Sequence, residues 1–282
     1  MKGCILMKAD LHLHTTESDG RLHREELFKL AKSRNIDYIA ITDHDVCHHV
    51  DDNRQLAAQY GVHYIPGIEL STLYEGKSVH VLGYFRSDGY QSDVMERFYV
   101  ETKARRERRA RMFIDKLAHY YNLHIRYEDI VSVSHGIIAR PHIAKAIRMR
   151  YPQYSHNEVF DLFIGEHTKA YVPSAEIQLP EGIALLREHD AVVVLAHPTL
   201  LKSHIHDAVL EHDFDGIEAI YGLNRAHDTE RYCALAKARG WLVTAGSDFH
   251  GIENDTKHKE LGDITLEGRA LEAFLQAVRF TQ

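Results

Sequence analysis

Two histidines, His12 and His14, stand two residues apart in the stretch DLHLH at residues 10–14. Leucines alternate with them, which is the pattern of a β-strand, where successive side chains point to opposite faces. Both imidazoles therefore face the same side. A second pair with the same spacing, Asp248 and His250, lies in GSDFH near the other end of the chain. Nitrogen and oxygen donors paired in this way can hold a metal ion.

Further donors lie where apolar, strand-like runs give way to polar residues. His44 follows residues 38–41 in TDHD, and His197 follows residues 191–195 in LAHP. Asp19 lies in the loop behind the first strand. Because chemistry in α/β folds collects at the carboxyl ends of the strands, we expect these side chains to gather with the two pairs.

A β-hairpin is predicted around the Glu-Gly dipeptide at residues 75–76, which favours a tight turn. If Tyr74 and Lys77 flank that turn, Ser71 faces His80 across the two strands. Glu69 then lies diagonally beside His80 on the same face. The hairpin therefore adds one carboxylate and one imidazole to the set.

Together these segments project six imidazoles and three carboxylates toward one mouth. The nine residues are His12, His14, Asp19, His44, Glu69, His80, His197, Asp248 and His250. Any one of them alone could be a chance pair, a capped turn or a satisfied core histidine. As a buried cluster they would repel one another if protonated, and would lack donors if neutral, unless cations occupy it. Ligands of this kind without thiolate suit Zn²⁺, Mn²⁺ or Fe²⁺, and nine are enough for two or three ions.

The elements that must position these donors alternate between strands and helices. Apolar strand-like runs are found at residues 37–45, 62–85, 191–198, 214–222 and 240–250, and amphipathic helical stretches at 23–35 and 227–240. This alternation predicts an α/β fold with a mostly parallel sheet, either open or closed into a barrel.

Residues of about 90–180 break the alternation, and we interpret them as a helical insertion within a single domain spanning residues 1–282. A long charged helix is expected at residues 94–121. Its basic run, KARRERRARM at residues 103–112, could hold an oligonucleotide or could be a solvated helix face. The net charge of −7 favours the solvated face, and it argues against general nucleic-acid binding.

The composition is that of an ordinary globular protein, with 44% apolar and 27% charged residues. No apolar run reaches the roughly 20 residues that a membrane span needs, so no membrane partner is expected. The three cysteines, Cys4, Cys47 and Cys233, are widely spaced and form no CxxC pattern. We therefore expect no disulfide framework and a reduced, cytoplasmic location.

The ordered motifs DLHLHTTESDG, ITDHD, PGIELS, HVLGY, LAHP and GSDFHG resemble those of the polymerase-and-histidinol-phosphatase (PHP) family. The resemblance covers essentially the whole chain, and it implies a distorted (β/α)7 barrel with the helical insertion added. It also implies a cluster of two to three divalent transition-metal ions (Mn, Zn or Fe) at the carboxyl ends of the strands.

The resemblance further assigns each donor to an ion. The first ion would be held by His12, His14, Glu69 and Asp248; the second by Asp19, His44 and His250; and the third by Glu69, His80 and His197. Glu69, which would bridge two ions, and Asp248 are then the catalytic carboxylates.

Substrate-binding candidates come from two regions. Arg140 in ARPHIA and Lys169 in TKAYVP lie in the insertion, and similar segments in small-molecule PHP phosphatases contact phosphate and substrate. Tyr221, Asn224 and Arg225, in YGLNR, lie at and after the end of the strand at residues 215–221. Relatives often carry a histidine where Asn224 stands, so the resemblance does not identify the residue that would protonate the leaving group. Each of these residues could alternatively form a surface contact.

A cluster of this kind is suited to phosphate-ester hydrolysis by a metal-bridging hydroxide. We expect a hydrolase acting on phosphoric esters, most simply a phosphatase for small nucleoside 3′,5′-bisphosphate-type substrates, with short oligoribonucleotides as a further substrate. The alternatives are a cyclic phosphodiesterase acting on small sugar cyclic phosphates and a histidinol-phosphatase-like monoesterase. The alternative from a different class is a non-catalytic metal-binding partner domain. In such a domain we would expect some of the nine metal-ligand positions to be occupied by residues that cannot bind a metal.

Overall fold

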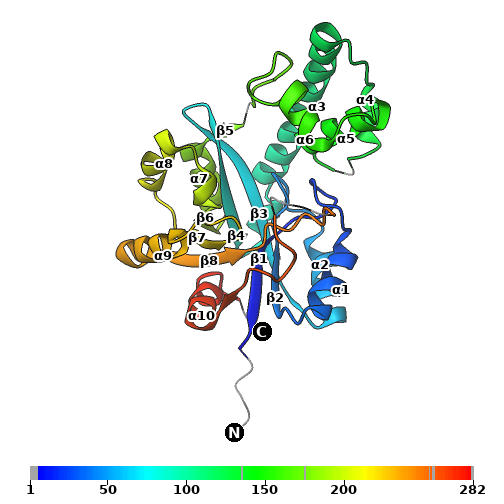
Figure 1. Cartoon of the computed structure of the whole chain (residues 1–282). Coiled ribbons are helices and arrows are strands. Elements are labelled where there is room, and N and C mark those ends of the chain that lie inside the picture. The colour runs from blue at the N-terminus through cyan, green and yellow to red at the C-terminus, as the bar shows by residue number, and fades with distance from the viewer. Residues whose placement is uncertain (1–5, 135, 175, 254, 256–257, 281–282) are drawn as a thin grey trace.

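The computed structural model describes residues 6–134, 136–174, 176–253, 255 and 258–280. Its centre is a sheet with the strand order β8-β7-β6-β4-β3-β2-β1-β9, and β5 pairs with β3 (Figure 1). The strands are β1 Lys8–Leu13, β2 Tyr38–Ile41, β3 His63–Tyr74, β4 Lys77–Phe85, β5 Ile177–Gln178, β6 Ala191–Leu195, β7 Gly216–Tyr221, β8 Leu242–Gly246 and β9 Leu266–Glu267.

The sheet curls until its two ends meet. Just after β8, Phe249 forms a parallel bridge with Leu13 of β1, and the backbone N–H of His14 donates to the carbonyl of Phe249 at 3.0 Å. The result is a nearly closed barrel. The strand β4 runs antiparallel to both of its neighbours, β3 and β6, and β9 runs antiparallel to β1, whereas the other strand pairs are parallel. The predicted distorted α/β barrel is confirmed.

The β3–β4 hairpin has the predicted register. Tyr74 pairs with Lys77, and Ser71 pairs with His80. The turn residues Glu75 and Gly76 both have positive φ angles, 48° and 71°, as a two-residue turn that matches the twist of the strands requires. Glu69 and His80 consequently lie on one face, close to the barrel mouth.

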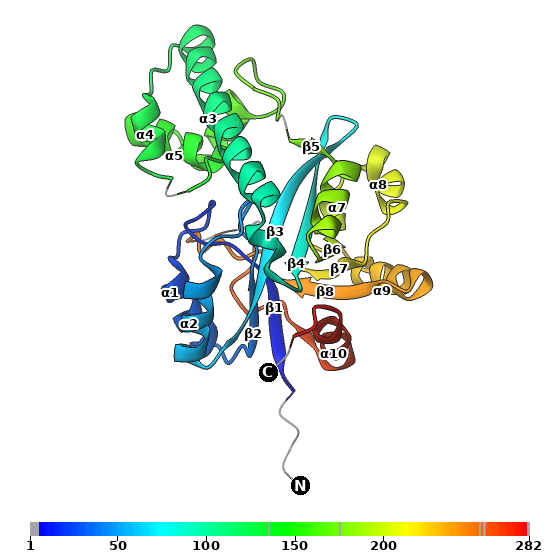
Figure 2. The ribbon, with the colours of Figure 1, turned by 180° about the vertical axis from the view of Figure 1, so that it is seen from behind.

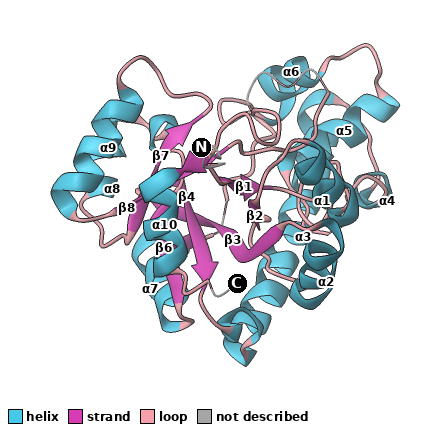
Figure 3. Ribbon diagram, turned by 90° about the horizontal axis from the view of Figure 1, so that it is seen from below, coloured by secondary structure: helices cyan, strands magenta, loops and turns pink. Residues whose placement is uncertain are grey.

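Helices cover the outside of the barrel, as Figure 3 shows from below. They are α1 Arg24–Ser33, α2 Val50–Tyr60, α7 Leu179–Glu188, α8 Ser203–Leu210, α9 Asp228–Arg239 and α10 Gly268–Ala277, with a short η3 Pro198–Leu200 before α8. Each buries an apolar stripe; in α1, the stripe is Leu27, Phe28 and Ala31, all 0% exposed. This burial supplies the driving force that holds the strand ends, and the polar residues on them, in place.

The helical insertion projects from one side of the barrel mouth (Figures 1 and 2). It comprises η1 Asp88–Gln91, α3 Asp93–Tyr121, α4 Tyr127–Val131, α5 Arg140–Arg150, α6 His156–Val159 and η2 Phe160–Ile164. The 29-residue helix α3 begins at the N-cap Ser92, whose side chain accepts a hydrogen bond from Met95 N. Its Met95 and Tyr99 pack in the barrel core, whereas Phe113 and Leu117 pack in a second core within the insertion.

Two contacts fasten the insertion to the loops of the barrel mouth. The guanidinium of Arg106 on α3 forms an ion pair with Asp45, and it donates to Ser71 Oγ at 3.0 Å. The backbone N–H of Ile137 donates to the carbonyl of Glu17 at 2.9 Å. The Arg106 side chain is only 10% exposed. The interpretation of the basic run as a solvated face is therefore wrong at Arg106, because that side chain turns toward the barrel and is covered.

Cys47 and Cys233 are free thiols, and Cys4 lies outside the described residues. Among the helices of the described chain, none combines the length and the apolar character needed to cross a membrane.

Candidate metal centre

The predicted donors converge at the mouth of the barrel, on β1, β3 and β4 and on the segments that follow β1, β2, β6 and β8. One group comprises His12, His14, Glu69 and Asp248, whose donor atoms all lie within 4.8 Å of one another. Glu69 Oε2 is 3.3 Å from His12 Nε2 and 3.2 Å from His14 Nε2. Asp248 Oδ1 is 3.4 Å and 3.1 Å from the same two nitrogens. These are the four residues that the resemblance assigns to one ion.

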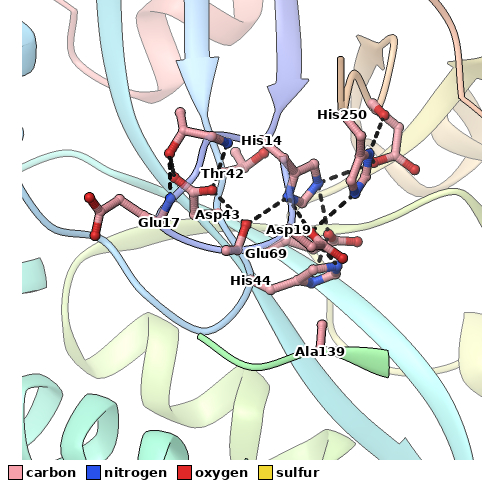
Figure 4. A network of polar contacts seen from close by, with 12 residues as sticks. His14, Glu17, Asp19, Thr42, Asp43, His44, Glu69, Ala139 and His250 are labelled. Carbon is pink, nitrogen blue, oxygen red and sulfur yellow. Dashed lines mark hydrogen bonds and ion pairs between the residues drawn. The ribbon is translucent and has the colours of Figure 1, made fainter. Parts of the chain in front are cut away.

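A second group adjoins the first and shares His14 with it. Its members are His14, Asp19, His44 and His250, with donor atoms again within 4.8 Å of one another. Figure 4 shows their side chains and that of Glu69 pointing toward one another. His250 Nε2 lies 3.2 Å from Asp19 Oδ1, and His44 Nε2 lies 3.9 Å from it.

The other oxygen of Glu69 faces a third group. Glu69 Oε1 lies 2.7 Å from His80 Nδ1 and 2.9 Å from His197 Nε2. The two oxygens of one carboxylate thus face different sets of imidazoles, which is the position of a bridging ligand. Together the three groups contain all nine of the predicted donors.

Six buried donor atoms of this cluster have no hydrogen-bond partner. They are His12 Nε2, His14 Nε2, Asp19 Oδ1, His44 Nδ1, Glu69 Oε2 and Asp248 Oδ1. Burying a polar atom without a partner is costly, and here the unsatisfied atoms face one another. Divalent cations placed among them would satisfy all six, and the mixed nitrogen and oxygen set fits Zn²⁺, Mn²⁺ or Fe²⁺.

The electrostatics of the cluster show the same need for positive charge. Burial opposes ionisation of Asp19, Glu69 and Asp248, yet the surrounding imidazoles hold the pKa of each carboxyl well below its usual range. Burial would likewise lower the pKa of His14, but the neighbouring carboxylates of Asp248 and Glu69 raise it to about 10. Burial lowers the pKa of His44 to about 3.

The sequence profile of the PHP domain matches residues 10–235. The chain belongs to the PHP domain family. The match includes all or part of seven of the strands, β1 to β7, and most of the donors, and the fold and the cluster described above are consistent with it.

Curated PHP relatives are similar to almost the whole chain. A 5′-3′ exoribonuclease of Haemophilus influenzae is 28% identical over 86% of this chain and 90% of its own length. A phosphoribosyl 1,2-cyclic phosphate 1,2-diphosphodiesterase of Eggerthella lenta is 26% identical over 87% and 95% of the two chains. A 3′,5′-nucleoside bisphosphate phosphatase of Chromobacterium violaceum is 25% identical over 86% of each chain.

A solved structure from Bifidobacterium adolescentis, assigned to the metal-dependent phosphoesterases, has the same architecture. It superimposes with a TM-score of 0.82 at 25% identity, covering 95% of this chain and 96% of that one. The agreement extends over the insertion as well as the barrel, because almost none of either chain is left out.

Behind the PHP cluster lies a carboxylate that the sequence analysis missed. Glu218 on β7 is 1% exposed, and its Oε1 accepts from His12 Nδ1 at 3.0 Å, while its Oε2 accepts from the backbone N–H of His197 at 2.8 Å. A carboxylate on Nδ1 directs the Nε2 lone pair of His12 into the cluster. Gly246 makes room for this contact, since a Cβ there would come within 2.2 Å of His12 Cβ.

Replacing Glu218 by Gln should lower metal affinity about 10- to 100-fold, because the amide keeps the size of the side chain but offers one acceptor in place of two. Competition with a chelator, read by elemental analysis, measures the change. The matched control is Glu272→Gln on an exposed face of α10, which should leave affinity unaltered. Unchanged affinity in Glu218→Gln would show that this carboxylate serves only to hold β7.

A tenth imidazole, His258, also lies beside the cluster. Its ring stacks on His250 with centroids 4.0 Å apart, and its Nδ1 lies 2.6 Å from Asp255 Oδ2. The remaining nitrogen, Nε2, is 3.9 Å from Asp248 Oδ2. Sequence reasoning missed His258 because it lies in an irregular loop, where no strand or helix period indicates the direction of a side chain.

The residues predicted for substrate binding after β7 have other partners. The hydroxyl of Tyr221 donates to Asp248 Oδ2 at 3.0 Å, and burial raises the pKa of this hydroxyl, so it remains a donor. The amide of Asn224 donates to Ala219 O and to Thr229 Oγ1, both at 2.8 Å. Tyr221 therefore orients a cluster carboxylate, and Asn224 holds its own loop together. Any direct role of either in substrate binding stays a prediction.

Arg140 and Lys169 lie on the insertion. The Arg140 guanidinium is 6.0 Å from the Phe160 ring and 5.9 Å from the Tyr171 ring. Lys169 is exposed, and its backbone N–H donates to Tyr121. Within the described residues, neither side chain bonds to the nine donors, so their assignment to substrate also stays a prediction.

Proposed function

We propose that this PHP protein is a phosphatase acting on nucleoside 3′,5′-bisphosphate-type substrates. As a member of its family, the chain is a metal-dependent phosphoesterase, a hydrolase acting on phosphoric ester bonds. The observation that carries the proposal is the convergence of six imidazoles and three carboxylates at the barrel mouth, where six of their buried donor atoms lack hydrogen-bond partners. A non-catalytic partner domain would not need to keep all nine metal-binding residues.

The three groups of donors would hold the metal ions in this proposal. His12, His14, Glu69 and Asp248 would hold one ion, Asp19, His44 and His250 a second, and Glu69 with His80 and His197 a third. Bound divalent ions supply charge neutralisation for a phosphoryl group and lower the pKa of a coordinated water.

The surrounding side chains orient the donors. Glu218 and Tyr221 fix one imidazole and one carboxylate, as described above. Asp43 accepts from Ser18 Oγ at 2.6 Å and from Thr15 N at 2.8 Å, which holds the loop between β1 and α1 that carries Asp19. Phosphoryl transfer depends on such rigid placement, because the protein contributes mainly positioning and electrostatic stabilisation to this reaction.

Positive charge on the insertion supports a substrate with a second phosphate. Burial lowers the pKa of Arg109, and the neighbouring guanidiniums of Arg140 and Arg106 lower it further, although the carboxylate of Glu176 acts in the opposite direction. The ion pair of Arg106 with Asp45, the residue after His44, places α3 beside the cluster. Within the described residues, Arg140 forms no ion pair, so its guanidinium can bind an anion such as a second phosphate of the substrate.

The test is an assay on the metal-loaded protein that measures both released phosphate and the monoester formed by opening a cyclic phosphate, with metal counted by elemental analysis. We expect two to three ions per chain and faster turnover of a nucleoside 3′,5′-bisphosphate than of histidinol phosphate or a sugar cyclic phosphate. Faster turnover of the cyclic phosphate would favour the diesterase alternative. Full metal loading with no hydrolysis of any ester would contradict an enzyme of either kind.

Arg140→Ala should lower kcat/KM for the bisphosphate by about 10- to 150-fold, because one charge-assisted contact contributes roughly 1.5–3 kcal/mol. An aryl monophosphate, which has no second phosphate, should be affected far less. Arg148→Ala, on an exposed turn of the same helix, is the control. Equal losses on both substrates would place Arg140 at the reacting phosphate. No loss on either substrate would show that Arg140 makes only a surface contact.

A further inference from the structure

A cavity of about 730 Å³ lies between the loops that follow β6 and β7. One wall begins at Thr199, two residues after the cluster residue His197, and continues through Lys202 and Ser203. The other wall begins at Arg225, four residues after Tyr221, and includes Asp228 and Arg231. Both loops leave the carboxyl ends of their strands, which is the end of the barrel where the metal centre lies.

The wall nearest the cluster is held in a fixed shape. Asp228 Oδ2 accepts from Thr199 Oγ1 at 2.9 Å and from the backbone N–H of Arg225 at 2.8 Å. This carboxylate therefore ties the loop after β6 to the loop after β7. The ring of His197 lies 5.4 Å from that of Tyr221, which connects the same two loops at the cluster itself.

The cations at this cavity have weak partners or none. Within the described residues, the side chains of Lys202 and Arg225 make no ion pair, and both are exposed. Arg231 meets only Asp207, at 3.7 Å, with 58% and 91% of the two side chains exposed. An exposed pair of this kind contributes little, so the guanidinium remains available to another anion.

We propose that this cavity is the subsite for the next phosphodiester-linked nucleotide of an extended substrate. The inference rests on the proposed function and deepens it. A volume of about 730 Å³ is within the range of sites that hold small organic molecules, and one nucleotide fits it. Lys202, Arg225 and Arg231 supply the charge that a phosphodiester needs. The insertion lies on the other side of the mouth from α8 and α9, so both sides of a substrate centred on the metals would be held (Figures 1 and 2).

The test compares two substrates in two variants of the full-length, metal-loaded protein. The substrates are a nucleoside 3′,5′-bisphosphate and a 5′-phosphorylated trinucleotide of RNA. The subsite variant is Lys202→Ala/Arg231→Ala. The matched control is Lys237→Ala/Arg269→Ala, which removes two exposed cations from α9 and α10 away from the cavity.

We expect the subsite variant to lose about 5- to 30-fold in kcat/KM on the trinucleotide, mainly through KM, and less than about 3-fold on the bisphosphate. The slope of log KM against log salt for the trinucleotide should also fall by about 0.7 for each lost phosphate contact. The control should change neither value.

Three results would overturn the subsite. They are equal losses on both substrates, no loss on the trinucleotide, and failure of the unaltered protein to hydrolyse the trinucleotide while it hydrolyses the bisphosphate. The last result leaves the proposed function standing. Failure of the unaltered protein on both substrates would instead contradict the proposed function.

Discussion

Replacing Glu69 by Gln is expected to lower phosphate release at least about 1000-fold and to remove about two metal ions per chain. Glu69 Oε2 lies 3.3, 3.2 and 3.1 Å from nitrogens of His12, His14 and His44. Its Oε1 lies 2.7 and 2.9 Å from His80 and His197. Glutamine keeps the shape but puts an N–H₂ group where one of these oxygens was, and that group cannot bind a cation.

Elemental analysis of the purified Glu69→Gln variant gives the number of ions lost, and circular dichroism checks that the barrel is intact. Glu75→Gln, at the exposed tip of the same hairpin, is the matched control and should keep full metal and activity. Loss of a single ion would show that Glu69 does not bridge. Full metal content with lost activity would mean that this carboxylate acts on the substrate and not on the metals.

Arg106→Ala is expected to destabilise the protein by about 3–5 kcal/mol, or roughly 6–15 °C in Tm. The substitution leaves Asp45, whose side chain is 1% exposed, without its cation and also removes the hydrogen bond to Ser71. A buried carboxylate deprived of its partner carries the full cost of its desolvation. Because Asp45 follows His44, we also expect weaker metal binding.

Thermal unfolding of four proteins tests this expectation: the wild type, Arg106→Ala, Asp45→Ala and the double variant. If the pair is coupled, the double variant loses markedly less than the sum of the single variants. Arg108→Ala, exposed two residues further along α3, is the control and should shift Tm by little. Additive losses would mean that Arg106 acts through packing, and unchanged stability would contradict a fastened insertion.

The positions of the nine donors could be predicted because each depends on local rules. A period of two places His12 and His14 on one face, and the turn at Glu75 and Gly76 sets which residues of the hairpin face each other. Strand ends in an α/β fold meet at one mouth whatever the details of the packing. None of these arguments requires knowing which helix covers which strand.

What the sequence did not show depends on long-range packing. Glu218 is an acid in the middle of an apolar strand, a signal that could have been noticed, but its contact with His12 follows only once β7 and β8 lie beside β1. Arg106 and Arg109 share a helix face, yet the helical period alone does not say whether that face meets solvent or the barrel. His258 follows no regular element.

The donors come from almost the whole length of the chain, from His12 on β1 to His250 after β8, and the bridge between Leu13 and Phe249 joins the two ends. On the ribosome, the first histidines are therefore made long before their last partners. At synthesis rates of about 5–20 residues per second, the interval is on the order of 10–50 s. Until then, the barrel cannot close and the binding site is incomplete. The group formed by His12, His14, Glu69 and Asp248 is therefore complete only once Asp248 has been made, and a chain truncated before that residue would lack the fourth donor of this group.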